Sequence, residues 1–335
     1  MRKLVIFGNG LGRALDNEFF NLESALSYAW EDSGVLGDDQ KELIWQCLPQ
    51  ELIEVGLETF PSSEAHLDRL QRVLAACDEI LKYETSGGEG WLSEAGRVFP
   101  DAIRSYLHCA ASYFHSGEHQ LPSTFVQPLV DWILESRSHI ATLNYDQLLY
   151  RAFIGTSVFN GYACLLDGFV PNFDSQNLHR FNPSNQSFYL HLHGSPLYFT
   201  AGDGNIWKSS LGNLPGLEGH SSSHIVLTHV HHKTSVIGAS PVLREYWGRL
   251  ETAMSESEAI VLFGYAGGDI HLNQSISRNF RDKQVEVVER KKPEYETTDG
   301  QAERINYWCK KLGVSHVSCW WHDSILDHAV WDYKR

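Results

Sequence analysis

From about residue 137 onward, the chain alternates between short apolar runs typical of buried strands and amphipathic runs typical of helices. The strand-like runs are SHIATLN, GYACLLDGF, FYLHLHG, SPLYFT, HIVLTHV, EAIVLFGY, QVEVVER and GVSHVSCWW. The helical runs between several of them are QLLYRAF, PVLREYWGRLETAMSES, DIHLNQSISRNF and AERINYWCKKLG. Because strands joined through helices normally pair in parallel, this alternation predicts an α/β fold. We expect a three-layer Rossmann-like sheet, mostly parallel, with helices on both faces.

The start of the chain adds one more strand to this sheet. Residues 3–7 form a short apolar run, and the glycine-rich turn GNGLG follows at 8–12. Residues 21–136 have little strand character and carry apolar residues at helical spacing instead. We therefore predict a sheet domain of residues 1–20 plus 137–335. The helical insertion of residues 21–136 would serve as a lid or an assembly face.

Charge and composition exclude several classes of protein. A net charge of −15 disfavours direct binding of nucleic-acid phosphates. No run approaches the ~20 apolar residues that span a bilayer, and the apolar run near the N-terminus is too short for a signal peptide. The six cysteines include no Cys-x-x-Cys pair, which fits a reducing compartment. We expect a cytoplasmic protein without membrane contact.

Polar and glycine residues follow four of the predicted strands. Gly8–Gly12 follows the first, Asn144 and Asp146 the next, His193 a third, and the segment GYAGGD (264–269) a fourth. The carboxyl ends of parallel strands meet at one edge, where α/β proteins bind ligands. Asp146 could also cap the following helix. We predict that these residues converge on one crevice, in which the glycine turn could approach a phosphate.

A nicotinamide-dependent dehydrogenase is disfavoured by the spacing of the chain. Such a domain places a second strand soon after the glycine turn, with an acidic residue about 20 positions on to bind a ribose. Here more than a hundred residues of helical character intervene, and Arg13 stands where that motif has glycine. Hydride transfer is therefore not the predicted reaction.

Together, these motifs resemble the sirtuin-like superfamily, and more closely the sirtuin-like NAD-hydrolase domains of bacterial antiphage systems. The matching segments, in the family's order, are GNG (8–10), TLNYD (142–146), LHGS (192–195) and GYAGGD (264–269). The chain departs from the family at Asn9, where alanine is common, and at Ala266, where serine is usual.

The resemblance implies a role for each of these residues. Asn144 would hold a ribose hydroxyl or the attacking water, and Asp146 would hold the nicotinamide carboxamide. His193 would act as general base, for which an imidazole is suited. The other implied cofactor contacts are Gly8, Asn9, Gly10 and Leu11 at the pyrophosphate, Gly264, Tyr265 and Asp269 at the adenosine ribose, and Gly194.

The predicted function is therefore hydrolysis of NAD+ to nicotinamide and ADP-ribose. The resemblance further implies an NAD-depleting effector of antiphage defence, acting by abortive infection. Because free NAD+ hydrolysis is toxic, we expect it to be controlled by homo-oligomerisation or by a partner, such as a HerA-type ATPase or an Argonaute-like protein.

Two alternatives remain open from the sequence. The first is a non-catalytic sensor that binds NAD or ADP-ribose, because fold alone does not fix function; the presence of Asn144 and His193 favours hydrolysis. The second is a metal hydrolase, since His191 with His193 and His229 with His231 form two His-x-His pairs, with His232 alongside. A sirtuin deacylase is disfavoured because its zinc module needs paired cysteines, so no zinc is expected.

Overall fold

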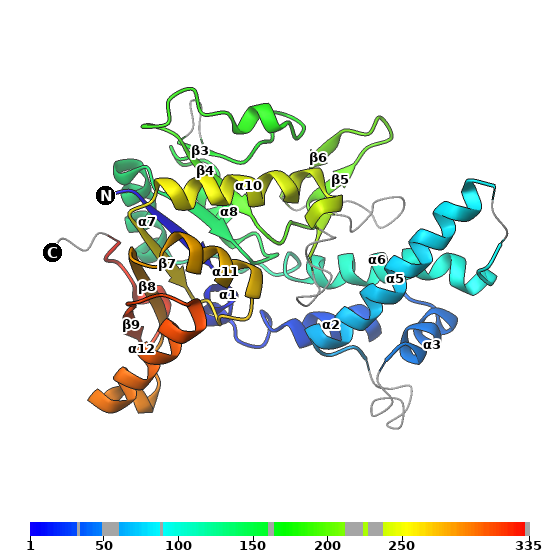
Figure 1. Cartoon of the computed structure of the whole chain (residues 1–335), viewed down its shortest axis with the longest axis horizontal. Coiled ribbons are helices and arrows are strands. Elements are labelled where there is room, and N and C mark those ends of the chain that lie inside the picture. Colours follow the sequence, from blue (N-terminus) through cyan, green and yellow to red (C-terminus); the bar gives the residue numbers. More distant parts are fainter. Residues whose placement is uncertain are drawn as a thin grey trace. The chain divides into compact units, whose positions relative to one another are not determined.

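The computed structural model describes residues 1–31, 34–48, 60–87, 90–159, 164–211, 224–226 and 237–331 (Figure 1). The chain divides into two compact units, which we call unit 1 and unit 2. Unit 1 comprises Met1–Asn17, Glu118–His193 and Val242–Arg335, and unit 2 comprises Glu18–Gly117 and Gly194–Pro241. With the exception of Gly194, every predicted site residue belongs to unit 1.

Unit 1 is built on a seven-stranded sheet in which every strand pair is parallel. The strands, in their order across the sheet, are β3 (Leu165–Leu166), β4 (Ser187–His191), β2 (His139–Thr142), β1 (Lys3–Phe7), β7 (Ala259–Phe263), β8 (Gln284–Arg290) and β9 (Ser318–His322). The central strands are buried along their whole length, as expected for a parallel sheet covered on both faces. The predicted Rossmann-like α/β class is confirmed.

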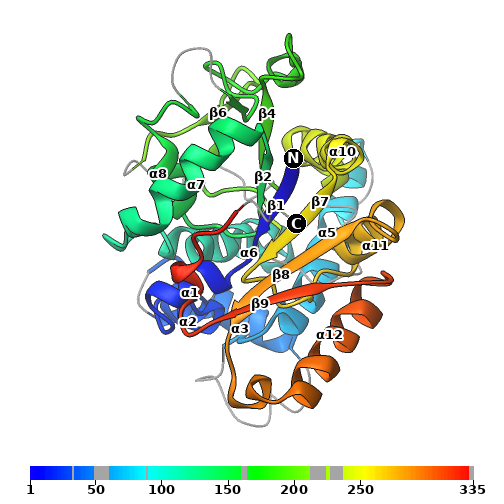
Figure 2. The same cartoon turned by 90° about the vertical axis from the view of Figure 1, so that its left-hand side faces the viewer.

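Helices cover both faces of this sheet (Figure 2). On one face lie α7 (Ser123–Ser136) and α8 (Leu148–Phe153), and on the other lie α10 (Pro241–Glu256), α11 (Ile270–Asn279) and α12 (Thr298–Leu312). The short α1 (Gly10–Leu15) follows β1 directly. Within the described ranges, none of the helices combines the length and the apolar character that a membrane span requires.

The strand order fixes where a ligand would bind in unit 1. After β1 the chain continues to β2 on one side of it, and it later returns to place β7 on the other side. The direction of the connections therefore reverses between β1 and β7. In open α/β sheets, ligands bind outside the carboxyl ends of the strands at such a switch point.

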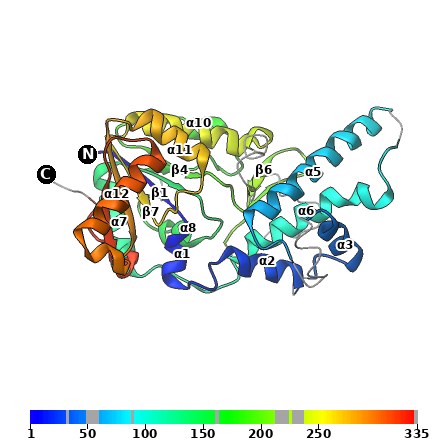
Figure 3. The same ribbon diagram turned by 60° about the horizontal axis from the view of Figure 1, so that its bottom comes forward.

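Unit 2 is mainly helical. Its described elements are α2 (Leu22–Glu31), α3 (Asp38–Gln46), α5 (Glu64–Thr85), α6 (Glu94–Tyr113), and the antiparallel pair β5 (Tyr198–Thr200) and β6 (Ile206–Lys208). Helix α6 packs against α2 and α5 (Figure 3), and the buried Tyr106 donates to the carbonyl of Leu26 at 3.3 Å. Helix α7, the last of the predicted insertion, belongs to unit 1, and residues 194–241 belong to unit 2. The role of residues 21–136 as a lid or assembly face stays a prediction.

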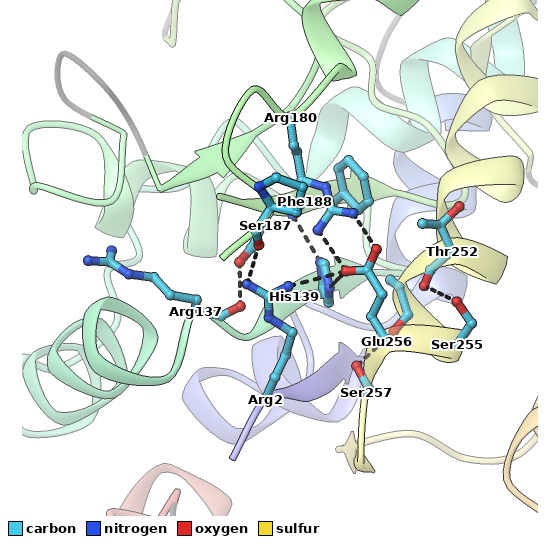
Figure 4. A network of polar contacts seen from close by, with 12 residues as sticks. Arg2, Arg137, His139, Arg180, Ser187, Phe188, Thr252, Ser255, Glu256 and Ser257 are labelled. Atoms are coloured by element: carbon cyan, nitrogen blue, oxygen red, sulfur yellow. Dashed lines mark hydrogen bonds and ion pairs between the residues drawn. The ribbon is translucent and has the colours of Figure 1, made fainter. Parts of the chain in front are cut away.

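A polar network holds the amino ends of β2 and β4 in unit 1 (Figure 4). The wholly buried His139 accepts the N–H of Phe188 at its Nδ1 (3.1 Å), so Nε2 carries the hydrogen and faces Glu256 Oε2 at 3.4 Å. Glu256 also binds the guanidinium groups of Arg180 (2.7 Å) and Arg2 (3.2 Å). His139, followed by Arg180, holds the pKa of Glu256 well below its usual range. This network lies at the edge opposite to the carboxyl ends and fastens the end of α10 to the sheet.

Candidate active site

Three glycines bring the turn after β1 against the turn after β7. Gly8 donates its N–H to the carbonyl of Phe263 and Gly10 donates to that of Gly264, both at 2.9 Å. A Cβ added to Gly8 or Gly10 would lie 2.7 Å from the Gly264 backbone, and one added to Gly264 would lie 2.9 Å from Gly10. Gly264 also has a φ of +61°, which disfavours other residues. We call this backbone-to-backbone meeting of Gly8, Gly10 and Gly264 the glycine contact.

The glycine contact explains Gly8 and Gly10 without a ligand. The N–H groups of Gly8 and Gly10 donate to carbonyls across the contact, and that of Leu11 donates to the carbonyl of Gly8 at 3.1 Å. What glycine provides at these positions is the space for close approach. The predicted contact of residues 8–11, including Asn9, with a pyrophosphate stays a prediction.

Asn144 is tied to the same turn. It follows β2, is 5% exposed, and donates from Nδ2 to the carbonyl of Gly8 at 3.1 Å, while its N–H donates to Thr142 Oγ1 at 3.0 Å. The bond from Nδ2 to Gly8 fixes the orientation of the side-chain amide. Its Oδ1 is buried and accepts no hydrogen bond from the residues that the structure describes. A buried acceptor without a donor is unfavourable, so this oxygen is suited to receive a hydrogen bond from a bound hydroxyl or water.

Asp146 is buried beside Asn144 and also serves the next helix. Its Oδ1 accepts the N–H of Leu148, the first residue of α8, at 2.9 Å. Burial raises the pKa of Asp146 to about 6, although the Leu148 N–H and the Asn144 side chain both act in the opposite direction. The predicted local bond to the helix start is thus present.

His193 is paired with a carboxylate that comes from the far side of the switch point. Its Nε2 lies 3.1 Å from Oδ2 of Asp269, and the Asp269 side chain is only 5% exposed. The other oxygen of Asp269 accepts the N–H of Leu272 at 3.1 Å and so caps α11. The sequence interpretation assigned Asp269 to the adenosine ribose and missed this pair, whose members are 76 positions apart.

Tyr265 holds the shape of the loop that carries Asp269. Its hydroxyl accepts the N–H of Asp269 at 3.0 Å and donates to Oδ1 of Asn273 at 2.9 Å. Asn273 in turn donates to the carbonyl of Gly267 at 2.9 Å. The tyrosine hydroxyl is therefore engaged inside the loop. Contact of Tyr265 or Gly264 with a cofactor stays a prediction.

Gly194 belongs to unit 2, where its backbone forms an isolated antiparallel bridge with Ile225. Its φ is +79°, and a Cβ there would lie 1.6 Å from the carbonyl oxygen of His224. Close approach of the 224–226 segment is thus sufficient reason for a glycine. Its predicted cofactor contact stays a prediction.

The histidines of the metal alternative are only partly described. The ring of the buried His191 lies among aromatic rings, 5.0 Å from that of Tyr189 and 6.4 Å from that of Tyr150. His229, His231 and His232 lie outside the described residues. Within the described part of the chain, no group of three or more His, Cys, Asp or Glu side chains is placed to hold a metal ion.

Contacts in unit 1 join the ends of four neighbouring strands. Asn144 links the end of β2 to the end of β1, and the glycine contact links β1 to β7. The His193–Asp269 pair joins residues that follow β4 and β7, and β2 and β1 lie between those two strands. The ring of Tyr145, between Asn144 and Asp146, lies 6.2 Å from the ring of His193. The predicted residues after these four strands therefore share one edge.

Comparison with known proteins is consistent with this arrangement. No curated protein matches the chain. The model of the family described as SIR2-like domain matches residues 138–315, which is more than half of the chain and includes three of the four segments that meet at this edge. By this match, the chain belongs to the SIR2-like domain family.

Proposed function

We propose that the chain is an NAD+ glycohydrolase, which cleaves the bond between nicotinamide and ribose to give nicotinamide and ADP-ribose. SIR2-like domains use NAD+. The observation that carries the proposal is the pairing of His193 with Asp269 across the ends of β2 and β1, beside the segment that holds Asn144 and Asp146. An imidazole, an oriented amide and a buried carboxyl group are thereby gathered at the switch point, where such folds bind nucleotides.

Each side chain has a task that suits this reaction. NAD+ supplies a cationic leaving group, so positive charge develops on the ribose as nicotinamide departs. Asn144 Oδ1 would accept a hydrogen bond from a ribose hydroxyl or from the attacking water, and thus orient it. His193 would take the proton of that hydroxyl or water and release it to solvent. Asp146 would accept an N–H of the nicotinamide carboxamide.

The buried Oδ1 of Asn144 is the feature that best fits a bound ribose or water. Its amide cannot turn freely, because Nδ2 is held by the carbonyl of Gly8 at 3.1 Å. A donor from a ligand would satisfy this oxygen. Oriented groups of this kind lower the barrier by holding the reactants in place and by stabilising developing charge.

We also propose the biological role implied by the resemblance of the motifs. The chain would deplete NAD+ in antiphage defence and stay silent until a homo-oligomer forms or a partner activates it. The activating partner would be a HerA-type ATPase or an Argonaute-like protein. The absence of any Cys-x-x-Cys pair in the sequence supports hydrolysis over protein deacylation.

The proposal is tested by incubating the purified chain with NAD+, alone and with the proteins encoded beside it, and measuring nicotinamide and ADP-ribose by chromatography. Release of both products is expected under at least one condition. Asn144→Ala and His193→Ala should each lower turnover by roughly 10²–10⁴-fold, the usual effect of losing a group that acts on the reacting atoms. The exposed Asn185→Ala and His316→Ala are matched controls and should keep wild-type turnover.

Other outcomes would replace this proposal. Tight binding of NAD+ without turnover under every condition would establish the sensor. Loss of activity with a chelator, or in His231→Ala but not in His193→Ala, would establish the metal hydrolase.

A further inference from the structure

The contact between His193 and Asp269 determines which nitrogen of the imidazole carries hydrogen. Nε2 of His193 lies 3.1 Å from Oδ2 of Asp269. An ionised carboxylate only accepts hydrogen bonds, so Nε2 must donate. A neutral imidazole has one hydrogen on its two nitrogens, and the lone pair is then on Nδ1.

Asp269 is held more firmly than a typical loop carboxylate. One oxygen caps α11 through the Leu272 N–H, and the main-chain N–H donates to the hydroxyl of Tyr265 at 3.0 Å. Tyr265 is anchored by Asn273. The side chain of Asp269 is 5% exposed, whereas that of His193 is 17% exposed. The carboxylate side of the pair is therefore enclosed, and the imidazole is the more accessible member.

From this geometry we propose that Asp269 is a positioning residue, which fixes His193 in the tautomer with hydrogen on Nε2 and makes Nδ1 the basic atom. The inference deepens the proposed function and rests on it for its catalytic meaning. In the hydrolysis, an O–H bond of water breaks and its proton moves to Nδ1. The oxygen then bonds to the ribose carbon, and nicotinamide leaves with the electron pair of the broken C–N bond.

Two substitutions at Asp269 separate this role from capping. Serine and asparagine are good helix caps, so Asp269→Ser and Asp269→Asn keep a cap for α11. Serine is too short to reach His193, and asparagine offers no carboxylate. Thr297→Ala is the matched control, because Thr297 caps α12 by accepting the N–H of Gly300 at 3.1 Å and does not touch His193.

The first readout needs no substrate. Long-range ¹H–¹⁵N correlation spectra of the free protein report the tautomer of His193, whose signals are identified by their loss in His193→Ala. We expect hydrogen on Nε2 in the wild type and in Thr297→Ala, and a mixture of tautomers in Asp269→Ser. Hydrogen on Nδ1 in the wild type, or an unchanged tautomer in Asp269→Ser, would overturn the inference.

The second readout is kinetic. Asp269→Ser and Asp269→Asn should lower kcat by about 10- to 100-fold and change KM by less than about twofold, as is common when the partner of a functional histidine is removed. A fall in kcat of the same size in Thr297→Ala would mean that loss of a cap is the cause, and would overturn the positioning role. If the wild type does not hydrolyse NAD+, the proposed function fails, while the spectra still decide the tautomer.

Discussion

Burial changes the pKa of Asp146. Its carboxyl group would be ionised well below neutral pH on the surface, but burial raises its pKa to about 6. Protonation turns one carboxyl oxygen into a hydrogen-bond donor, and the other oxygen, Oδ1, already accepts the N–H of Leu148. The proposed hold on the carboxamide should therefore depend on pH in the mildly acidic range.

We expect NAD+ to bind less tightly as the pH falls through 6. The measurement is the Kd for NAD+ by calorimetry at pH 7.5 and pH 5, in His193→Ala, which should not consume the ligand. Only about a tenth of Asp146 is ionised at pH 5, so the Kd should rise roughly tenfold. Asp146→Asn in the same background should bind equally at both values. A pH dependence that persists in this double variant would assign the titration to another group.

At this scale the sequence predicts the residues but not their partners. Asn144, Asp146 and His193 could be selected because each follows a strand-like run and the resemblance supplies roles. The bonds from Asn144 to Gly8 and from His193 to Asp269 could not be predicted. They depend on which strands are neighbours and on how each loop bends, and neither property is local in the chain.

At the scale of whole elements, ion pairs hold the amino ends of β2 and β4. Glu256 joins α10 to His139 on β2 and to Arg180 in the loop before β4. This loop also carries the fully buried Leu178, and its half-buried Phe173 packs 6.0 Å from the ring of Tyr246 on α10. The network adds to this apolar attachment, and its loss should reduce stability without touching the opposite edge.

Glu256→Gln should lower the free energy of unfolding by about 1–3 kcal/mol, because it leaves two guanidinium groups and the Nε2–H of His139 without a charged acceptor. The measurement is the urea midpoint at pH 7. Glu258→Gln, two positions away and exposed, is the matched control and should change the stability by less than about 0.5 kcal/mol. Equal effects of the two substitutions would show that the network does not stabilise the fold.

Element type could be predicted well where the apolar pattern is long. The strand-like run at 138–144 became β2 (His139–Thr142), and its last residues form the turn that carries Asn144. Short elements were less accessible: β3 is only two residues of the strand-like run at 161–169, and β6 (Ile206–Lys208) lies in none of the predicted runs. The boundaries of such elements are set by contacts such as the glycine contact, and not by propensity.

Across the whole molecule, buried histidines link stability to acidity. Burial lowers the pKa of His139, and it lowers those of His224 and His328 to about 4. Below about pH 6.5 these histidines are protonated in the unfolded chain but stay neutral in the folded protein. The free energy of unfolding therefore decreases as the pH falls toward 4. Glu256, whose folded pKa is depressed, loses its contribution at still lower pH. Asp146, whose folded pKa is raised, makes the free energy of unfolding increase as the pH falls from about 6 to 4.

The chain should therefore be less stable at pH 5 than at pH 7, by up to about 2 kcal/mol for each of His224 and His328. Urea unfolding at the two pH values measures the difference. His224→Gln should reduce this difference, whatever its effect at pH 7, and the exposed His316→Gln should leave it unchanged. Greater stability at pH 5 would mean that Asp146 outweighs the histidines.

The organisation into units is the part that the sequence reveals least. Helical spacing indicates a helical segment over 21–136, but the grouping of residues 18–117 with 194–241 rests on contacts between distant segments. A linear pattern carries no information on such contacts.

The strand order also determines when neighbouring strands can pair during synthesis. β1 leaves the ribosome well before its neighbour β7, which begins only at residue 259, 252 positions after β1 ends. At 5–20 residues per second, roughly 13 to 50 seconds pass before β7 exists. Until then, Phe263 and Gly264 are not available to accept the N–H groups of the first turn, and Asp269 is not available to His193. A growing chain thus lacks the complete edge that we propose for NAD+ cleavage until the segment after β7 has been made.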